Sequence, residues 1–418
     1  MGIGDAMNGP AWASITPEIV SRGELPAALS LNSAGYNVAR VIGPALGGLV
    51  VAGIGSGQAF FFNAVSFLAV FAVLYRWRRT PRQSMLPAEQ VAGAMRSGLR
   101  YVRHSPPVKA VLVRSGAFLF AASALWALLP LVALRLGHGS LGYGGLLGSI
   151  GLGAVCGAGF LPRLRRRVGV DVLSAGATAV VAVVMMLTPF QPHPALLYLL
   201  MIVAGGGWLT MMVSLNVAVQ NSKPFWVRAR ALAVYIFVFQ GAMALGSVFW
   251  GTLAKYEGVP YTLAAAGVLM LLGLTAVGRY PLEAAEGLKL DPSMHWPELS
   301  VLSPPEPDHG PVLVTVEYRV DPKNSREFAE AMRDVGRSRK RDGAIQWGLF
   351  RDTADPWRQV ETFVVESWAE HLRQHERVTV ADREVETLAR AFHVGEAPPQ
   401  TSHLIFSYER DSERWESQ

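Results

Sequence analysis

Long apolar runs alternate with short polar segments over the first two-thirds of the chain. A helix that crosses a membrane needs roughly 20 consecutive, mostly apolar residues. Runs of this length occur at 27–52, 58–75, 115–134, 136–162, 231–254 and 258–278, and two more lie within 172–222, which breaks at the proline-rich segment 189–194. A shorter run at 3–20 adds part of one helix. The pattern predicts an all-α polytopic membrane domain with eight full spans and one partial span.

The pattern changes near residue 310. Val312, Val314, Val316 and Tyr318 alternate with more polar positions, which is typical of a strand. Helical spacing returns at 325–340, 367–377 and 379–392, and strand-like segments occupy 344–351, 358–368 and 402–408. The order β-α-β-β-α-β predicts a small α+β unit of the ferredoxin-like type.

Charge divides the chain at the same place. Charged residues fill 30 of the first 290 positions and 40 of the last 128, with net charges of +14 and −8. This split excludes a single soluble enzyme, a coiled coil and a disordered chain. The pI of about 9.5 does not indicate nucleic-acid binding, because the polar part is acidic. The lone Cys156 excludes an intrachain disulfide and a cysteine-based zinc site.

The loop charges predict the orientation. Basic loops at 76–114, 163–167 and 223–230 alternate with loops that carry little or no net charge. Because basic loops stay on the cytoplasmic side, we expect these loops and the acidic C-terminal region in the cytoplasm. The setting would be a bacterial inner membrane, and the partial first helix would enter from outside.

This pattern divides the chain into six parts. They are a partial transporter half (1–78), an interhalf loop with an amphipathic helix (79–109), a six-helix half (110–285), a linker (286–310), the α+β domain (311–410) and a tail (411–418). Transporters are commonly built from two matching halves. The uneven helix count suggests that about three N-terminal helices are missing, through a wrong start codon or a real truncation. A natural protein with eight or nine spans is the alternative.

Several motifs resemble the major facilitator superfamily. Gly43, Pro44, Gly47 and Gly48, within GPALGG at 43–48, resemble the second half of the antiporter motif in the fifth helix of its exporters. The segments RGELP at 22–26, LNS at 31–33 and NVAR at 37–40 resemble its enterobactin-exporter-like, or transmembrane secretion effector, branch. Residues 93–107 are similar to the amphipathic helix between the halves, and 159–169 to a degenerate Gly/Arg loop. The resemblance implies a secondary exporter.

The spans carry few candidate transport residues. Arg40, with Asn37 one turn before it, would line the substrate path, or it would snorkel to the surface. Asp5 is a candidate for proton coupling, although near the chain start it could also stay hydrated. Asn216 and Gln240 would contact substrate or form interhelical hydrogen bonds.

Two further features have competing interpretations. The small residues around Pro44 predict a bent helix between the halves, or an ordinary close helix crossing. The basic loop of Arg163, Arg165, Arg166 and Arg167 predicts an anchor on anionic lipid.

The α+β region resembles the antibiotic-biosynthesis-monooxygenase family of dimeric α/β barrels. The resemblance rests on EYRV at 317–320, RDGA at 341–344, ESW at 366–368 and EHL at 370–372, with Trp347, Glu361 and His375. It implies pairing through the sheets, and oxidation of aromatic compounds or haem breakdown as activities. His371 and His375, four residues apart, share a helical face that suits a metal or haem, or else a solvated or dimer-contact face. Trp347 and Trp368 would be core residues or pocket walls.

The sequence therefore predicts a secondary active exporter of a small amphipathic molecule (a siderophore, drug or secondary metabolite). It would work by alternating access, coupled to protons, with a C-terminal domain that regulates or dimerises it. The expected partners are the lipid bilayer, the substrate and a second copy, with no nucleic acid, no cofactor and no metal. The alternatives are a membrane-anchored, cofactor-independent oxygenase and an inactive, truncated transporter.

Overall fold

A computed structural model describes residues 31, 56–76, 91–135, 139–285, 287–293, 295, 296 and 305–407. The chain forms two compact units, residues 1–85 and 86–418. In the first unit, the predicted span 58–75 lies within helix α3 (Ser56–Arg76). Two other predicted helices, at 3–20 and 27–52, lie outside the described residues except for Leu31. Seven candidate residues also lie outside the described residues: Asp5, Asn37, Arg40, Gly43, Pro44, Gly47 and Gly48.

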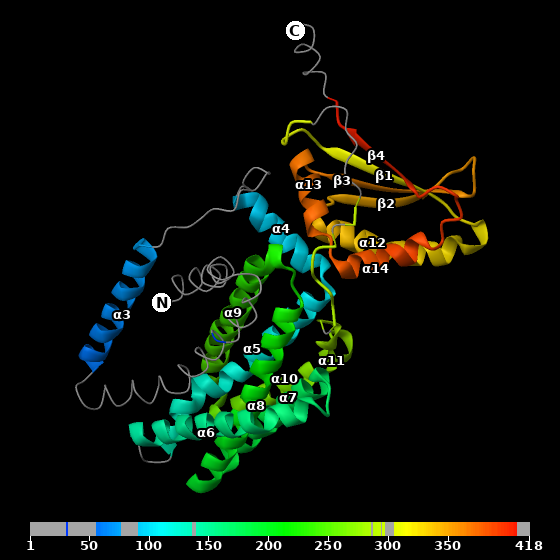
Figure 1. Ribbon diagram of the computed structural model, residues 1–418. Coiled ribbons are helices and arrows are strands. Elements are labelled where there is room, and N and C mark those ends of the chain that lie inside the picture. The colour runs from blue at the N-terminus through cyan, green and yellow to red at the C-terminus, as the bar shows by residue number, and fades with distance from the viewer. Residues whose placement is uncertain are drawn as a thin grey trace. The chain divides into compact units, whose positions relative to one another are not determined.

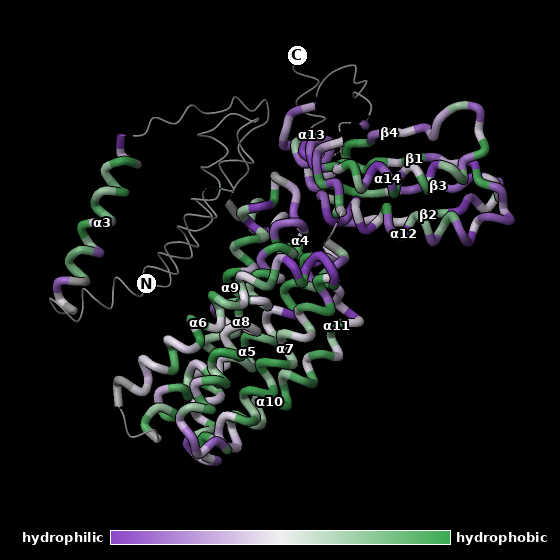
Figure 2. The backbone as a smooth tube through the Cα atoms, turned by 60° about the horizontal axis from the view of Figure 1, so that its bottom comes forward, coloured by the Kyte–Doolittle hydropathy of each residue, from purple (hydrophilic) through white to green (hydrophobic). Residues whose placement is uncertain are grey.

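The second unit begins with α4 (Val91–His104) and continues with a bundle of long helices. Their bounds are α5 (Pro106–Arg135), α6 (Gly139–Arg165), α7 (Val170–Leu187), α8 (Pro194–Asn221), α9 (Arg228–Glu257) and α10 (Val259–Leu272), followed by α11 (Ala276–Arg279). Six helical segments between residues 106 and 279 are long and apolar enough to cross a membrane. This confirms the six spans predicted after residue 110, and Figure 2 shows their hydrophobic character.

Proline and glycine set the ends of these helices. Pro194 occupies the first position of α8, where its missing N–H group leaves no hydrogen bond unmade. The predicted break before it is confirmed, because the chain leaves α7 through a short 3₁₀ turn at Thr188–Phe190. Gly258 separates α9 from α10 with a φ of 82°, a conformation that side chains with a Cβ rarely adopt.

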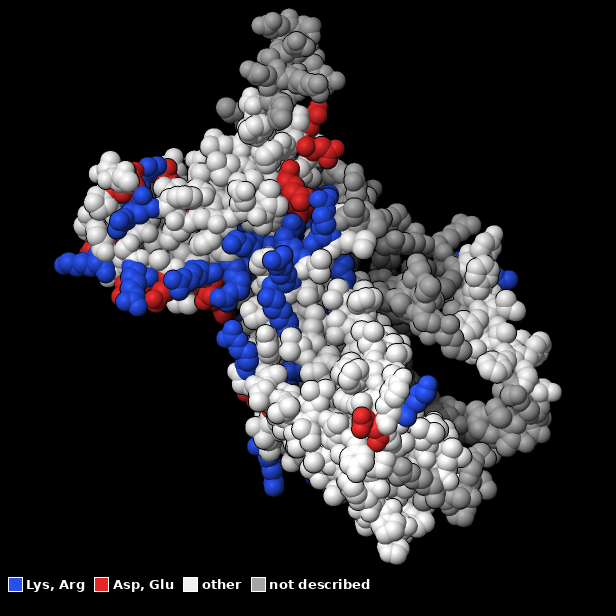
Figure 3. All heavy atoms as spheres, turned by 180° about the vertical axis from the view of Figure 1, so that it is seen from behind, with Lys and Arg blue, Asp and Glu red and all other residues white. Residues whose placement is uncertain are grey.

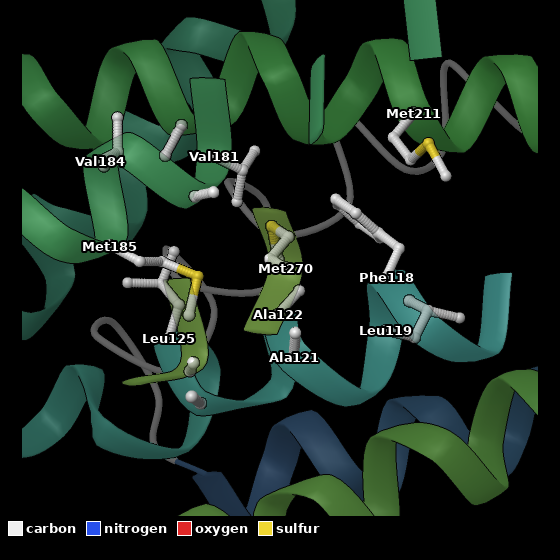
Figure 4. Close-up of a cluster of buried hydrophobic side chains, with 14 of the residues drawn as sticks. Phe118, Leu119, Ala121, Ala122, Leu125, Val181, Val184, Met185, Met211 and Met270 are labelled. Atoms are coloured by element: carbon white, nitrogen blue, oxygen red, sulfur yellow. The ribbon is translucent and has the colours of Figure 1, made fainter. Parts of the chain in front are cut away.

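The bundle has an apolar interior and an apolar exterior. Leu125 of α5, Val181 and Met185 of α7, Met211 of α8 and Met270 of α10 are buried together (Figure 4). On the outside, large apolar side chains such as Phe237 and Val248 of α9 are 78% and 70% exposed. An exterior of this kind suits contact with lipid tails.

The C-terminal region forms a four-stranded antiparallel sheet with three helices. Its elements are β1 (Val312–Arg319), α12 (Ser325–Asp342), β2 (Gln346–Arg351), β3 (Arg358–Val365), α13 (Trp368–Arg377), α14 (Val380–Arg390) and β4 (Gln400–Ile405). The strand order is β2-β3-β1-β4. Val312 lies opposite both Val365 and Ile405, so β1 is a central strand. The chain order of strands and helices agrees with the sequence pattern.

One face of the sheet packs against helices. In β1 the side chains of Val312, Val314, Val316 and Tyr318 are buried in alternation, as predicted. Tyr318 packs with Phe328 and Met332 of α12, and α12 lies along α14 on this face (Figure 1). The alternate positions form the opposite face, where Phe350 and Leu404 are 59% and 54% exposed.

Candidate functional site

Glycines allow neighbouring helices of the bundle to approach closely. A Cβ atom on Gly153 of α6 would collide with the backbone oxygen of Ile202 in α8, and one on Gly205 would collide with that of Ile150. A Cβ atom on Gly246 of α9 would collide with the hydroxyl of Ser123 and the backbone oxygen of Phe120 in α5. Close backbone packing of this kind holds membrane helices together where hydrophobicity alone cannot. The pairs α6–α8 and α5–α9 are therefore tightly packed.

An aromatic cluster lies between α5 and α8. The rings of Trp126 and Trp208 are 5.2 Å apart, edge to face, and Phe118 lies 5.7 Å from Trp208. The Nε1 atom of Trp126 is buried and has no hydrogen-bond partner among the described residues. By contrast, Nε1 of Trp250 donates to the backbone oxygen of Phe120, 2.7 Å away. The first cluster thus offers apolar surface with one unused donor, whereas Trp250 ties two helices together.

A buried ion pair joins α5 to the first turn of α7. Arg114 contacts the carboxylate of Asp171 and donates to the hydroxyl of Ser174 over 2.6 Å. The backbone N–H groups of Leu282 and Glu283 also donate to Asp171, at 2.9 and 3.1 Å. One carboxylate therefore joins α5, α7 and the segment after α11. Sequence reasoning missed this residue because Asp171 marks the edge of an apolar run.

Lys223 is a second group that sequence reasoning missed. It follows α8, is 5% exposed, and lines a cavity of about 10 Å³ with Ser222 and Tyr235. No carboxylate pairs with it within the described residues. Burial and the nearby charge of Arg228 lower the pKa of Lys223 to about 8. The amine can therefore gain or lose a proton near physiological pH.

The polar residues predicted within the six described spans do not gather at one site. Asn216 is exposed on α8 and donates to the backbone oxygen of Met212 in its own helix. Gln240 is exposed on α9. The predicted basic loop lies at the end of α6, where Arg163, Arg166 and Arg167 are exposed and Arg165 is half-buried. These exposed positions suit contact with lipid or solvent outside the bundle.

The C-terminal domain encloses a charged network. Nε of Arg339 donates to Glu361 over 3.1 Å and its Nη1 donates to Glu386 over 2.6 Å. The indole N–H of Trp347 also donates to Glu361, over 3.0 Å. Burial by itself would raise the pKa of Glu386, but Arg339 and His295 outweigh it and lower the pKa to about 2. Buried charges paired in this way hold the helices over the sheet.

The segment that leads into the domain completes this network. Trp296 donates from Nε1 to Oε1 of Glu386 over 3.1 Å, and the Arg339 guanidinium lies 4.7 Å from its ring centre. His295 Nε2 lies 3.0 Å from the other oxygen of Glu386. Residues 286–310 were predicted as a linker, but these two side chains belong to the packed domain. Their distance in sequence from Glu386 hid the contact.

Three histidines lie together beside this network. The ring of His371 is 4.9 Å from that of His375 and 4.8 Å from that of His403, and Trp368 packs on it. His371 is 1% exposed, so the prediction of a solvated face is wrong for this residue. Burial and the neighbouring histidines lower its pKa to about 3. The described residues contain no group of three side chains placed to hold a metal ion.

Comparisons with known proteins agree with this architecture. A family model described as "Transmembrane secretion effector" matches residues 1–412. The chain is also 25% identical over 293 residues to "Multidrug efflux pump Tap" of Mycolicibacterium fortuitum, and the alignment covers 64% of this chain and 67% of that protein. The match to the family model extends over both the helix bundle and the C-terminal sheet. The chain therefore belongs to the transmembrane secretion effector family of the major facilitator superfamily.

Proposed function

We propose that this protein is a secondary active exporter of a small amphipathic molecule (a drug, siderophore or secondary metabolite) that works by alternating access. The supporting observation is the cluster of Trp126, Trp208 and Phe118, which offers aromatic surface and an unused N–H donor inside a transporter bundle. Such a surface suits a molecule that is largely apolar and carries a polar group. The similarity to a multidrug efflux pump points the same way.

The test is efflux of a fluorescent lipophilic cation, such as ethidium, from cells that express the chain. Trp126→Phe removes the donor but keeps an aromatic ring, and Trp208→Ala opens the cluster. We expect both variants to weaken the apparent affinity for ethidium. The matched variant Trp250→Phe removes only the hydrogen bond from α9 to the Phe120 backbone in α5, and it should leave the affinity for ethidium unchanged. Equal affinities in all four proteins would contradict the proposed binding surface.

Export would be driven by proton entry. A proton-coupled carrier needs a group in the protein that titrates near the working pH. Lys223, with its pKa of about 8, is such a group in the second unit. Asp5 is the candidate in the first unit, where Arg40 and Asn37 would instead line the substrate path. Efflux that persists after the proton gradient is collapsed would contradict the coupling.

The proposed location is a bacterial inner membrane, with the C-terminal domain in the cytoplasm. The support is the alternation of basic and neutral loops, since Arg163, Arg165, Arg166 and Arg167 lie at the end of α6 and Lys223 follows α8. Labelling of single cysteines introduced after α6 and into the C-terminal domain tests the orientation. Both cysteines should react with a thiol reagent that cannot cross the membrane only when the cytoplasmic face is accessible to it.

The C-terminal domain would be a ferredoxin-like unit that pairs with a second copy. Its strand order, β2-β3-β1-β4, is the order expected of that fold. The face of the sheet opposite the helices leaves Phe350 and Leu404 exposed beside half-buried Leu313 and Val360. An uncovered apolar sheet face is a candidate for association.

A further inference from the structure

Helix α4 is held firmly to the helix bundle. Tyr101 is 1% exposed and donates from its hydroxyl to the backbone oxygen of Ser222, at the end of α8, over 3.1 Å. Its ring packs edge to face on Trp226, just before α9, at 5.5 Å. Gly98 lies against the side chain of Arg230 in α9. These contacts fix one side of α4 to α8 and α9.

The C-terminal domain holds the other side of α4. Arg100 donates to Glu370 of α13 over 2.8 Å, and Arg377 donates to the same carboxylate oxygen over 2.6 Å. The side chains of Glu370 and Arg377 are only 9% and 4% exposed. One buried carboxylate therefore binds an arginine from α4 and two arginines, Arg377 and Arg373, from its own domain.

Two cation–π contacts extend this junction. The Arg377 guanidinium lies 4.5 Å from the ring centre of Trp226, and that of Arg341 lies 5.6 Å from the ring centre of Tyr101. Arg377 also donates to the backbone oxygen of Asp342 over 2.8 Å. Tyr101 and Trp226, which hold α4 to the bundle, are thus also the rings that the domain's arginines contact. Figure 3 shows Lys and Arg gathered over this part of the unit, in contrast to the mostly uncharged bundle.

Because of its position in the chain, α4 can limit the movement of the membrane helices when it is held in place. The helix stands between α3 and the six described spans, so relative motion of the two membrane parts must be taken up by the chain around it. While α4 is held from both sides, the helix itself cannot take part in that motion. Freeing α4 would allow the helix to move with the membrane helices.

We propose that Arg100, Glu370 and Arg377 form a releasable latch through which the C-terminal domain restrains the transport cycle. The proposal rests on the proposed transport function, because the restraint acts on the alternating movement of the two membrane parts. Release of the latch separates Glu370 from Arg100, frees α4 and raises the rate of transport. The latch is part of the chain itself and needs no added ligand to form.

The test places a negative charge on α4. Arg100→Glu sets a carboxylate against Glu370, and Arg103→Glu makes the same charge change one turn along, at an exposed position of the same helix. The double variant Arg100→Glu/Glu370→Gln removes the repulsion and lets residue 100 pair with Arg377. Release is read as the rate of tryptic cleavage after the exposed Arg96 of α4, a site that every variant keeps, in membrane vesicles, and function is read as ethidium transport. Membrane insertion and a single gel-filtration peak in detergent show that each variant is folded.

We expect Arg100→Glu to raise both rates roughly fivefold or more, as for moderate coupling between two sites. Arg103→Glu should leave both rates unchanged, and the double variant should return both toward the original values. Unchanged cleavage in Arg100→Glu would show that there is no latch. Faster cleavage with unchanged or slower transport would show that the docked domain does not restrain the cycle. If the unmodified chain transports nothing, the transport function fails, while cleavage still reports the docking on which the latch depends.

Discussion

Arg114 and Asp171, 57 positions apart in sequence, form a buried ion pair that joins α5 to α7. Their side chains are 4% and 13% exposed, and Asp171 also accepts two backbone N–H groups from the segment after α11. A carboxylate with three donors holds all three segments in one arrangement. The pair is therefore a structural joint of the six-helix bundle.

Asp171→Asn should destabilise the bundle. The substitution leaves Arg114 buried without a counter-charge, which typically costs about 3–5 kcal/mol. The midpoint of thermal unfolding in detergent should fall clearly. Glu283→Gln, at an exposed side chain beside the same site, is the control and should leave the midpoint unchanged. An unchanged midpoint in Asp171→Asn would contradict a structural role for the pair.

Lys223 should produce a pH dependence of stability and transport. Its pKa is lowered from the ordinary 10.5 to about 8, so the unfolded chain binds more protons than the folded chain between these values. Stability should therefore rise with pH across this window. Lys223→Met should lose that rise and the inflection of transport near pH 8. The exposed Lys255→Met is the control, and its pH profiles should match those of the unmodified chain.

Trp296 should stabilise the C-terminal domain. Trp296→Phe removes the hydrogen bond to the charged Glu386, and hydrogen bonds to charged groups are worth about 1.5–3 kcal/mol. Trp296→Ala also removes the ring over Arg339 and should cost more. Hydrogen exchange of the β1 and β3 amides in the full chain would accelerate in the same order. Trp357→Phe, at a 41% exposed tryptophan, should not change it. Protection that persists in Trp296→Ala would refute the role of this segment.

The open face of the sheet should mediate pairing. Leu404→Glu places a charge on the exposed apolar face without touching the helices on the other side. We expect the chain in detergent to change from dimer to monomer, as measured by light scattering. Leu388→Glu, at an exposed leucine of α14, is the matched control and should stay dimeric. A monomer before any substitution would contradict pairing in solution.

The helices and strands could be predicted because their signals are local. An uncharged run such as 172–222 with prolines at 189–194 indicates two helices without reference to the rest of the chain. The alternation from Val312 to Tyr318 indicates a half-buried strand in the same way. Both features depend on neighbouring residues only, and both are present in the structure.

The main contacts at the candidate sites could not be predicted in this way. Arg100 meets Glu370 across 270 positions, and Trp296 meets Glu386 across 90. Nothing in the local pattern around Glu370 distinguishes a buried carboxylate from the first-turn acid of a surface helix. The local spacing of His371 left a metal or haem site, a solvated face and a dimer contact as alternatives, whereas tertiary packing against Trp368 and His403 buries this side chain. Burial of polar groups follows from the fold as a whole.

Transport by the purified protein tests the central claim most directly. The full chain is reconstituted into liposomes, an inward-directed or outward-directed pH gradient is imposed, and movement of ethidium across the bilayer is followed by fluorescence. We predict gradient-driven movement well above that of protein-free liposomes, with weaker apparent affinity in Trp126→Phe. Movement no faster than in protein-free liposomes, across a panel of amphipathic cations, anions and neutral compounds, would contradict the assignment as an exporter.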